Sequence, residues 1–435
     1  MSYTSVRRWL LCYGYYLLIK PQPKRNGDWV FINDFSIQLG QEKCLLTLGA
    51  SLAQLRKTGF NLSHQHVAVL DIVVTSQANN QLVKERLDMV SNRVGIPAQI
   101  VSDHGSDIKK GNELFCQQHP TVVYTYDISH KIGCLLKALL ESDCLWQCLL
   151  KDINVTLQQV QQTELSFLRP ILPRKKSRYL NISLIINWVT NILSYKDNHD
   201  FSLIESGYMI HPESIYQMIN SISDKNSVNS LIKMIKKKFA TKEDVVTELS
   251  LILQQGIEEK QIMIVDLSVK RFHDKFGLFE QYREFIGDLS SMIKLIEKIQ
   301  KIVKHQGLSI ETMEKIDKEI NFQELTGHRT TTIYYQIINY LKEELSKFGN
   351  TTKAYLASSD IEESLFGKYK YKLAERMGGI YESILMLAVL CSDYNLEDIK
   401  AASEMYNMQD VNNFIRPMIG KSIQSKRRMA FNDTS

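Results

Sequence analysis

Asp34 places one carboxylate in a stretch that otherwise reads as a buried strand. The stretch WVFINDFSIQLG, residues 29–40, consists mostly of aromatic and β-branched residues, which favour strands. An unpaired carboxylate in such a place costs several kcal/mol unless a partner or a proton compensates it. Asp34 therefore needs a lysine or arginine partner, a capping role in a turn, or a metal ion.

Two further acidic positions could join Asp34 in one site. Asp103 closes the apolar stretch AQIVSD, and the pair Glu362 and Glu363 opens a helical stretch far downstream. Ligands of open α/β sheets bind beyond the carboxyl ends of strands, where Asp103 would lie. Two aspartates and a glutamate form an all-oxygen set that suits Mg²⁺ or Mn²⁺. Two such ions could clamp the attacking and leaving oxygens of an in-line phosphodiester substitution.

The third acid of this set is either of two adjacent glutamates. Ser359 lies three residues before Glu362, the spacing of a capping box, which would occupy Glu362 at the helix start. The helical spacing of Ile361 and Leu365, however, brings Glu362 nearer to the buried stripe of the helix. We expect Glu363 to be the third acid and keep Glu362 as the alternative.

Composition indicates an ordinary globular protein with local concentrations of positive charge. Hydrophobic residues make up 44% and charged residues 23%, and the net charge is +5. Basic clusters occur at residues 169–178, 233–238 and 421–428. Each alone is typical of a solvated face, whereas several together favour a phosphate-backbone partner such as DNA.

Three classes of protein are disfavoured by what the sequence lacks. The seven cysteines form no CxxC pair, which argues against a zinc site and favours a reducing compartment. The apolar part of the N-terminal segment is too short to cross a membrane. No GxxxxGK[ST] loop is present, so we expect no nucleotide hydrolysis. These features predict a cytoplasmic protein without a membrane segment.

The elements that must position the acids form an α/β sheet. The hydrophobic pattern predicts strands at 29–37, 43–52, 66–75, 98–103 and 121–127, with helices at 76–94 and 107–117. The first three strands are close enough in sequence to be antiparallel, and the helical connections suit parallel neighbours for the last two. Helical patterns then dominate.

This pattern divides the chain into five segments. We expect an N-terminal helix and linker (1–28), the first part of the core (29–128), an all-α insertion (129–350), the last part of the core with the Glu helix (351–392), and a C-terminal helix with a basic tail (393–435).

Five stretches of the chain carry a resemblance to a known family. They are INDFSIQLGQEKCLLTLG, IVSDHGSDIKKG, YDISHKIGCLLK, QQTELSFLRP and SSDIEESLFGKYK. Taken together, they resemble the DDE transposases of bacterial insertion sequences. The resemblance runs from about residue 28 to 390 and implies a ribonuclease H-like fold, a mixed five-stranded sheet with flanking helices interrupted by a large all-α insertion. It makes Asp34 and Asp103 the first two catalytic acids and metal ligands. Its ES-aliphatic-FG pattern selects Glu363 as the third.

The same resemblance implies cofactors, partners and a location. It implies two Mg²⁺ (or Mn²⁺) ions, and transposon ends and target DNA as substrates for end cleavage and strand transfer. It also implies a homodimer or higher oligomer on DNA in the bacterial cytoplasm, associated with the nucleoid. Only 28 residues precede the first expected strand, so an end-recognition domain is either missing or encoded separately, or the helical insertion and basic tail replace it.

Other positively charged and orienting residues surround these acids in the sequence. Asp127 and His130 form a DxxH signature, in which His130 could contact a DNA phosphate or orient the second acid. The alternative is a helix start that Asp127 caps. Lys368, Lys370 and Arg376 follow the glutamates along one helix, where a DNA end would lie; each alone is typical of a solvated face.

Two other functions remain open at this point. A ribonuclease H-like nuclease that only hydrolyses would use the same acids, although simple nucleases lack a long helical insertion. A non-catalytic DNA-binding transposase remnant would keep the fold and need no acids.

Overall fold

The computed structural model describes residues 2–39, 42–172, 182–198, 269–321, 324–325, 327–349, 352–373 and 382–418. The chain divides into two compact units, one of residues 1–138 and 291–435, the other of residues 139–290. The predicted segment boundaries, with an insertion over 129–350, stay a prediction.

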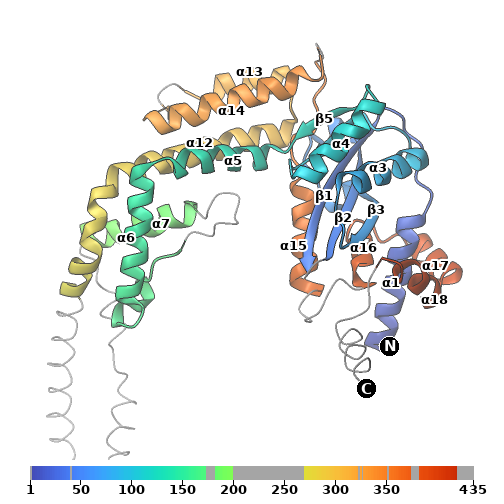
Figure 1. Cartoon of the computed structure of the whole chain (residues 1–435), viewed down its shortest axis with the longest axis horizontal. Coiled ribbons are helices and arrows are strands. Elements are labelled where there is room, and N and C mark those ends of the chain that lie inside the picture. Colours follow the sequence, from blue (N-terminus) through green and yellow to red (C-terminus); the bar gives the residue numbers. More distant parts are fainter. Residues whose placement is uncertain are drawn as a thin grey trace, which may run out of the picture. The chain divides into compact units, whose positions relative to one another are not determined.

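The first unit contains a mixed five-stranded sheet (Figure 1). Its strands are β1 (Trp29–Leu39), β2 (Glu42–Ser51), β3 (Ala68–Thr75), β4 (Gln99–Ser102) and β5 (Val123–Tyr126). The spatial order is β3-β2-β1-β4-β5. The first three strands are antiparallel, and β4 and β5 run parallel to β1. Both features confirm the prediction from the sequence.

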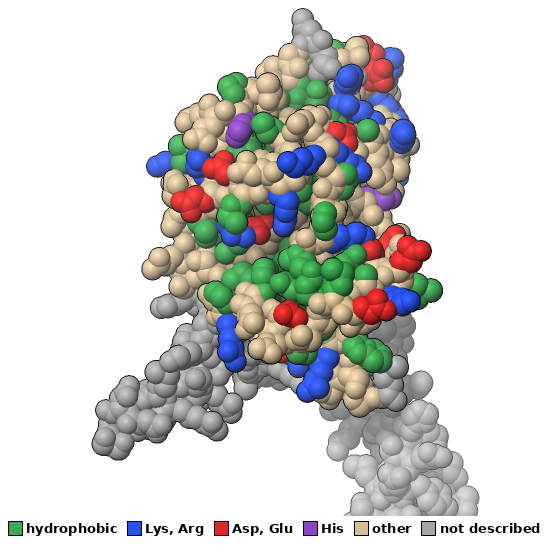
Figure 2. Space-filling model, turned by 90° about the vertical axis from the view of Figure 1, so that its right-hand side faces the viewer, with side chains coloured by type: hydrophobic (Ala, Val, Ile, Leu, Met, Phe, Trp, Pro, Cys, Tyr) green, Lys and Arg blue, Asp and Glu red, His purple; other side chains and the backbone are tan. Residues whose placement is uncertain are grey.

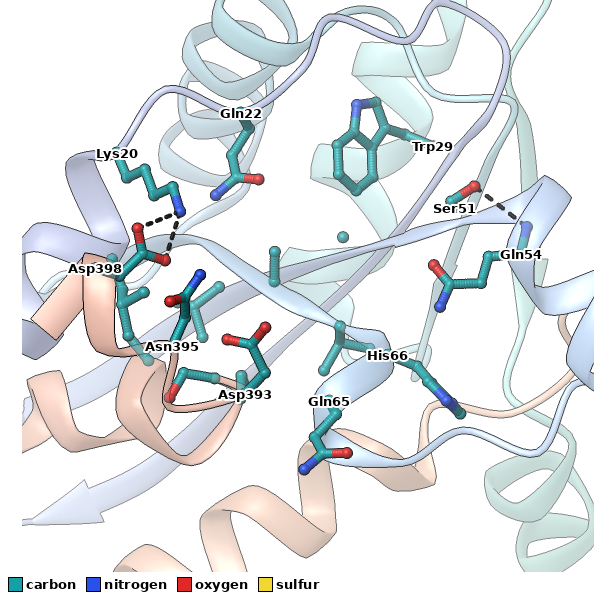
Figure 3. A pocket seen from close by; sticks show the side chains of 18 of the residues that line it. Lys20, Gln22, Trp29, Ser51, Gln54, Gln65, His66, Asp393, Asn395 and Asp398 are labelled. Carbon is teal, nitrogen blue, oxygen red and sulfur yellow. Dashed lines mark hydrogen bonds and ion pairs between the residues drawn. The ribbon is translucent and has the colours of Figure 1, made fainter.

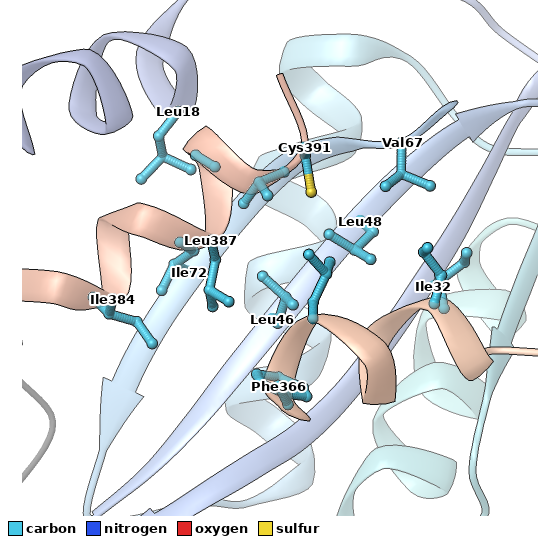
Figure 4. Packing of buried hydrophobic residues seen from close by; sticks show 14 of the residues in the cluster. Leu18, Ile32, Leu46, Leu48, Val67, Ile72, Phe366, Ile384, Leu387 and Cys391 are labelled. Carbon is cyan, nitrogen blue, oxygen red and sulfur yellow. The ribbon is translucent and has the colours of Figure 1, made fainter. Parts of the chain in front are cut away.

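Helices cover both faces of this sheet because side chains alternate along each strand. On one face, Trp29 and Phe31 pack against α3 (Asn80–Val94) and α4 (Ser106–Gln118). On the other face, Val30 and Ile32 pack against α15 (Asp360–Leu373) and α16 (Met386–Leu390). Figure 4 shows this second core, with Phe366 of α15 against the strands.

The N-terminal helix packs beside the C-terminal helices, as Figure 1 shows. These elements are α1 (Tyr3–Ile19), η5 (Glu382–Leu385), α17 (Leu396–Met405) and α18 (Met408–Ile415). Leu11 and Leu18 of α1 are buried in the same core as α15 and α16. The element η5 is a short 3₁₀ helix that α16 follows directly. Short elements α2 (Leu52–Thr58) and η1 (His64–His66) lie between β2 and β3.

Helices follow β5 in the first unit. They are α5 (Ile128–Glu141), α12 (Arg283–Gln306), α13 (Ile310–Glu319) and α14 (His328–Ser346), of which α5 and α12 each run into the second unit. The apolar stripe of α12 is buried and consists of Leu289, Met292, Ile293, Ile296, Ile299 and Val303.

The second unit is helical wherever it forms regular structure within the described residues. It contains α6 (Cys144–Val160), η2 (Glu164–Leu168), α7 (Ile182–Asn198), η3 (Gly277–Tyr282) and the first part of α12. Trp188 of α7 packs on Phe276 and Phe279.

One face of the molecule shows how charge is distributed over the first unit. In Figure 2, lysine and arginine side chains alternate with acidic ones, and hydrophobic side chains gather in one area below them. This face is therefore not a continuous basic surface. None of the described helices is both long and apolar enough to cross a membrane.

Candidate active site at the carboxyl ends of β1 and β4

The parallel pairing of β1 and β4 brings two of the predicted acids together. Ile32 pairs with Val101. Asp34 lies two residues further along β1, and Asp103 directly follows the end of β4. Ile32 and Val101 both belong to the core beneath α15. Because side chains alternate along β1, Asp34 projects to the same α15 side of the sheet as Ile32. The side chains of both aspartates are partly exposed.

Helix α15 turns one glutamate toward that side of the sheet. Its buried positions include Ile361, Leu365 and Phe366, and Glu362 belongs to the same stripe with 1% of its surface exposed. Neither carboxylate oxygen of Glu362 has a hydrogen-bond partner among the described residues. Glu363 is exposed. Helical spacing thus buries the first glutamate of the pair and exposes the second.

The electrostatics of Glu362 connect it to the two aspartates. Burial raises the pKa of Glu362 well above its usual value, and the nearby charges of Asp34 and then Asp103 raise it further. Glu363 has the smallest effect of the four neighbouring acids that act on this pKa. The carboxylates of Asp34 and Asp103 therefore lie close enough to Glu362 to act on it electrostatically.

The capping box predicted for Glu362 is wrong. The backbone N–H of Ser359, which would donate to Glu362 in a capping box, donates to Asp127 Oδ2 at 2.5 Å, and the hydroxyl of Ser359 donates to the same oxygen at 3.0 Å. The Glu362 carboxylate makes no hydrogen bond within the described residues. Asp127, which directly follows β5, therefore takes the place that sequence spacing assigned to Glu362. The catalytic role of Glu363 stays a prediction, but the structure brings Glu362 to the face of Asp34.

Asp127 joins the starts of two helices. Its side chain is fully buried, and Oδ1 accepts from the backbone N–H of His130 at 2.6 Å. Its other oxygen accepts from the backbone N–H of Ser359 at 2.5 Å. The predicted cap at the start of α5 is therefore present, and the same carboxylate also holds the residue that precedes α15.

The imidazole of His130 lies beside the second acid. His130 Nε2 is 3.8 Å from Asp103 Oδ2, and the backbone N–H of Gly105 donates to Asp103 Oδ1 at 3.1 Å. The two readings of the DxxH signature are thus compatible. The backbone of His130 is capped by Asp127, and its side chain lies near Asp103, where its orienting role stays a prediction.

A buried polar network lies behind the aspartates, on the α4 side of the sheet. Asn33 and Asn112 exchange two amide hydrogen bonds, at 2.9 and 3.1 Å. Asn112 also donates to Ser102 Oγ at 3.0 Å. These bonds join β1, β4 and α4 at the residues directly before Asp34 and Asp103. The network holds the two strand ends in register.

Gln99 ties β4 to the segment that enters α15. Its amide donates to the carbonyl of Leu356 at 2.6 Å and accepts from the N–H of Leu356 at 3.1 Å. Sequence reasoning missed Gln99, Asn33 and Asn112. The available signal was an amide within an apolar strand, because a fully buried polar side chain needs a specific partner.

Aromatic rings and lysine charges act on His104, the residue directly after Asp103. His104 stacks on Tyr126 with ring centroids 3.7 Å apart. Burial and, to a smaller extent, the charges of Lys109, Lys347 and Lys131 lower the pKa of His104 to about 4. Three lysines from three helical elements therefore create a positive field beside the acids, which suits an anionic ligand.

The predicted basic residues of α15 have separate outcomes. Lys368 Nζ lies 2.9 Å from His64 Nδ1, on the exposed side of the helix. The side chain of Lys370 and the whole of Arg376 lie outside the described residues, as do the basic clusters at 233–238 and 421–428. Their predicted DNA contacts stay predictions.

The donor set of the site matches a hard divalent cation, although the acids stand apart. Within the described ranges, no three acidic, histidine or cysteine side chains lie close enough together to hold one ion. Like charges repel one another when no cation is between them. The buried carboxylate of Glu362, which has both oxygens unpartnered in the described structure, fits a missing positive charge.

A separate polar pocket of about 340 Å³ opens at the other end of the sheet (Figure 3). It is lined by Trp29 at the start of β1, about 16 Å along the strand from Asp34. Lys20 binds the carboxylate of Asp398 there, at 2.6 and 2.8 Å. Because this acid already has its cation, the pocket differs in chemistry from the site of Glu362.

Comparisons with known proteins add one distant likeness. No protein-family model and no curated protein sequence matches the chain. Among solved structures, the chain is similar to one described as the Drosophila P element transposase strand transfer complex, at 11% sequence identity. The match covers 92% of this chain and 86% of that chain, with a TM-score of 0.32. A TM-score of this size establishes neither a shared fold nor a shared function.

Proposed function

We propose that the chain is a DDE-type polynucleotidyl transferase, a transposase that cleaves DNA ends and transfers the strands with Mg²⁺ or Mn²⁺. The observation that carries the proposal is Glu362, a fully buried carboxylate with no hydrogen-bond partner among the described residues. The charges of Asp34, within β1, and of Asp103, directly after β4, act on it. A buried carboxylate without a partner destabilises the fold, so its presence indicates that it serves a function.

The architecture supports the ribonuclease H-like part of the proposal. Three antiparallel strands are followed by two strands parallel to the first, with the order β3-β2-β1-β4-β5. The first acid lies within the central strand, the second directly follows its parallel neighbour, and the third comes from a helix on one face. This is the arrangement that the resemblance to DDE transposases implies.

The residues of the chain would divide the work as follows. Asp34, Asp103 and Glu362 would hold two divalent ions, which, when bound, supply charge neutralisation at the scissile phosphate and activation of the attacking oxygen. His130, whose Nε2 lies 3.8 Å from Asp103 Oδ2, would orient this carboxylate. Because carboxylates suffice for this chemistry, the site needs no serine or cysteine nucleophile.

Positive charge beside the acids would bind the substrate. Lys109 and Lys131, whose charges act on His104 next to Asp103, would contact phosphates on either side of the scissile bond. The origin in a bacterial insertion sequence, the location at the nucleoid and assembly into a homodimer or higher oligomer stay predictions.

Cleavage of DNA in defined metal ions tests the proposal. A supercoiled plasmid that carries the DNA flanking the gene should be nicked with Mg²⁺ or Mn²⁺, and joined products should appear if strands are transferred. Ca²⁺ should support binding with little cleavage. Equal cleavage in EDTA would refute the metal chemistry, and nicks without joined products would identify a nuclease that only hydrolyses.

A further inference from the structure

The side chains of α14 cover the outer edge of β5. This strand lies at the end of the sheet order, where backbone groups on one side have no neighbouring strand among the residues that the structure describes. The hydroxyl of Tyr340 donates to the carbonyl of Tyr126 at 2.5 Å, and Glu344 Oε2 accepts from the N–H of Tyr126 at 3.1 Å. One turn on, Lys347 Nζ donates to the carbonyl of Tyr124 at 3.2 Å.

These three side chains form one polar face of the helix. Positions 340, 344 and 347 follow the spacing that stacks side chains on one face. Glu344 is 6% exposed and is bonded to Lys347 Nζ at 2.8 Å through each oxygen. An apolar cover for the edge would avoid burying a carboxylate. The polar face instead holds β5 through directional bonds in one register.

The end of β5 that α14 binds leads directly into the candidate active site. Asp127 follows Tyr126, and its carboxylate accepts from the N–H of His130 and from both the N–H and hydroxyl of Ser359. A displacement of the end of β5 would therefore move the starts of two helices at once. One of them carries the imidazole beside Asp103, and the other carries Glu362.

We propose that α14 positions the catalytic acids through the edge of β5, with Tyr340, Glu344 and Lys347 as positioning residues. The inference rests on the proposed function for its effect on catalysis. None of the three is assigned to the metal ions. Removing the bonds of these residues to β5 should lower the turnover number. Tyr340→Phe removes no charge, so this variant should bind DNA without metal with nearly unchanged affinity.

The test compares Tyr340→Phe with Tyr334→Phe in the full chain. Tyr334 belongs to the same helix, and its hydroxyl donates to Asp317 Oδ1 at 3.5 Å, away from β5. Tyr340→Phe should lower the turnover number about 10- to 100-fold, the usual effect of losing a group that orients metal ligands. Tyr334→Phe should leave it unchanged. Glu344→Ala should act like Tyr340→Phe, and Glu343→Ala, at an exposed neighbour, should act like Tyr334→Phe.

Hydrogen exchange without DNA or metal separates this inference from the proposed function. Tyr340→Phe should accelerate exchange in residues 128–135 and also in residues 356–366, since the coupling passes through Asp127. Unchanged exchange in 356–366 would overturn the inference, even in a chain that cleaves DNA. Accelerated exchange there in a chain that never cleaves DNA would support the positioning and overturn the proposed function instead.

Discussion

Two glutamates in different units of the molecule are treated in opposite ways. In the first turn of α15, Glu362 is 1% exposed, and its pKa is raised well above the usual value by burial and by neighbouring acids. In η3, just before α12, Glu280 accepts from Arg283 Nε at 2.5 Å and Lys196 Nζ at 2.9 Å. Those two cations lower the pKa of Glu280 to about 2.

The difference teaches where charge serves stability and where it does not. Glu280 is exposed to water, where leaving it unpaired would cost little, and yet it has two cations. Glu362 is buried, where an unpaired charge costs most, and none of the described residues binds it. Stability alone would produce the reverse arrangement. The buried acid is therefore the one that we assign to function.

The largest expected effect separates the two adjacent glutamates of α15. Glu362→Gln should lower metal-dependent DNA cleavage at least about 10³-fold, since a bound metal supplies several kcal/mol to the transition state and each 1.4 kcal/mol is a factor of ten. Asp34→Asn and Asp103→Asn should do the same. Cleavage rates in Mg²⁺ measure all three.

Glu363→Gln is the matched control, because it makes the same change one residue along at an exposed position. It should keep most of the cleavage activity. If Glu363→Gln abolishes cleavage and Glu362→Gln does not, the assignment made from the sequence was right, and the buried acid has another role.

Asp127→Asn should give the next largest effect, this time on stability. The carboxylate accepts three hydrogen bonds from His130 and Ser359, and an amide cannot accept all of them without presenting a donor to a donor. We expect the free energy of unfolding to fall by about 2–3 kcal/mol, the range for bonds to a charged group. Urea denaturation measures the change; no loss of stability would show that Asp127 does not join the two helices.

A smaller effect of opposite sign is expected for Glu362→Gln without metal. The glutamine keeps the shape of the side chain and removes the possibility of a buried, uncompensated charge. At neutral pH the free energy of unfolding should therefore rise by about 1–2 kcal/mol, while Mg²⁺ should no longer stabilise the variant. Thermal melting with and without Mg²⁺ checks both statements. A variant that melts earlier without metal would mean that Glu362 has a stabilising partner.

Most of the sheet could be predicted from the sequence, because its signals are local. Strand β1 shows aromatic and β-branched residues, and α3 ends at Gly95, which has a φ of 100° and follows a regular apolar spacing. Hairpin distances predicted the antiparallel strands, and helical connections predicted the parallel ones. These features depend on residues close together in the chain.

The site was harder to predict because its decisive contacts join distant segments. A capping box within four residues seemed to occupy Glu362, but the backbone N–H of Ser359 donates instead to Asp127, 232 residues away in the sequence. Gln99 bonds Leu356, 257 residues away. The apolar stripe of Ile361 and Leu365 did point to Glu362. The capping-box spacing of Ser359 and the ES-aliphatic-FG pattern both favoured Glu363 and outweighed this sign of burial.

The smallest effect is expected where charge is already compensated. Glu280→Gln should lower the free energy of unfolding by at most about 1 kcal/mol, because exposed pairs are screened by solvent and Arg283 keeps Asp197 as a partner at 2.8 Å. The folded pKa of about 2 lies below the ordinary 4.5, so this stabilisation is present above pH 4.5 and is lost as the pH falls toward 2. The wild-type protein and the variant should therefore differ most near neutral pH and converge in acid, and added salt should reduce the difference. Hydrogen exchange of residues 277–300 at several pH values measures this locally. A loss much greater than 1 kcal/mol, or a difference that grows in acid, would mean that Glu280 is as dependent on its surroundings as Glu362, and the contrast between the two glutamates would fail.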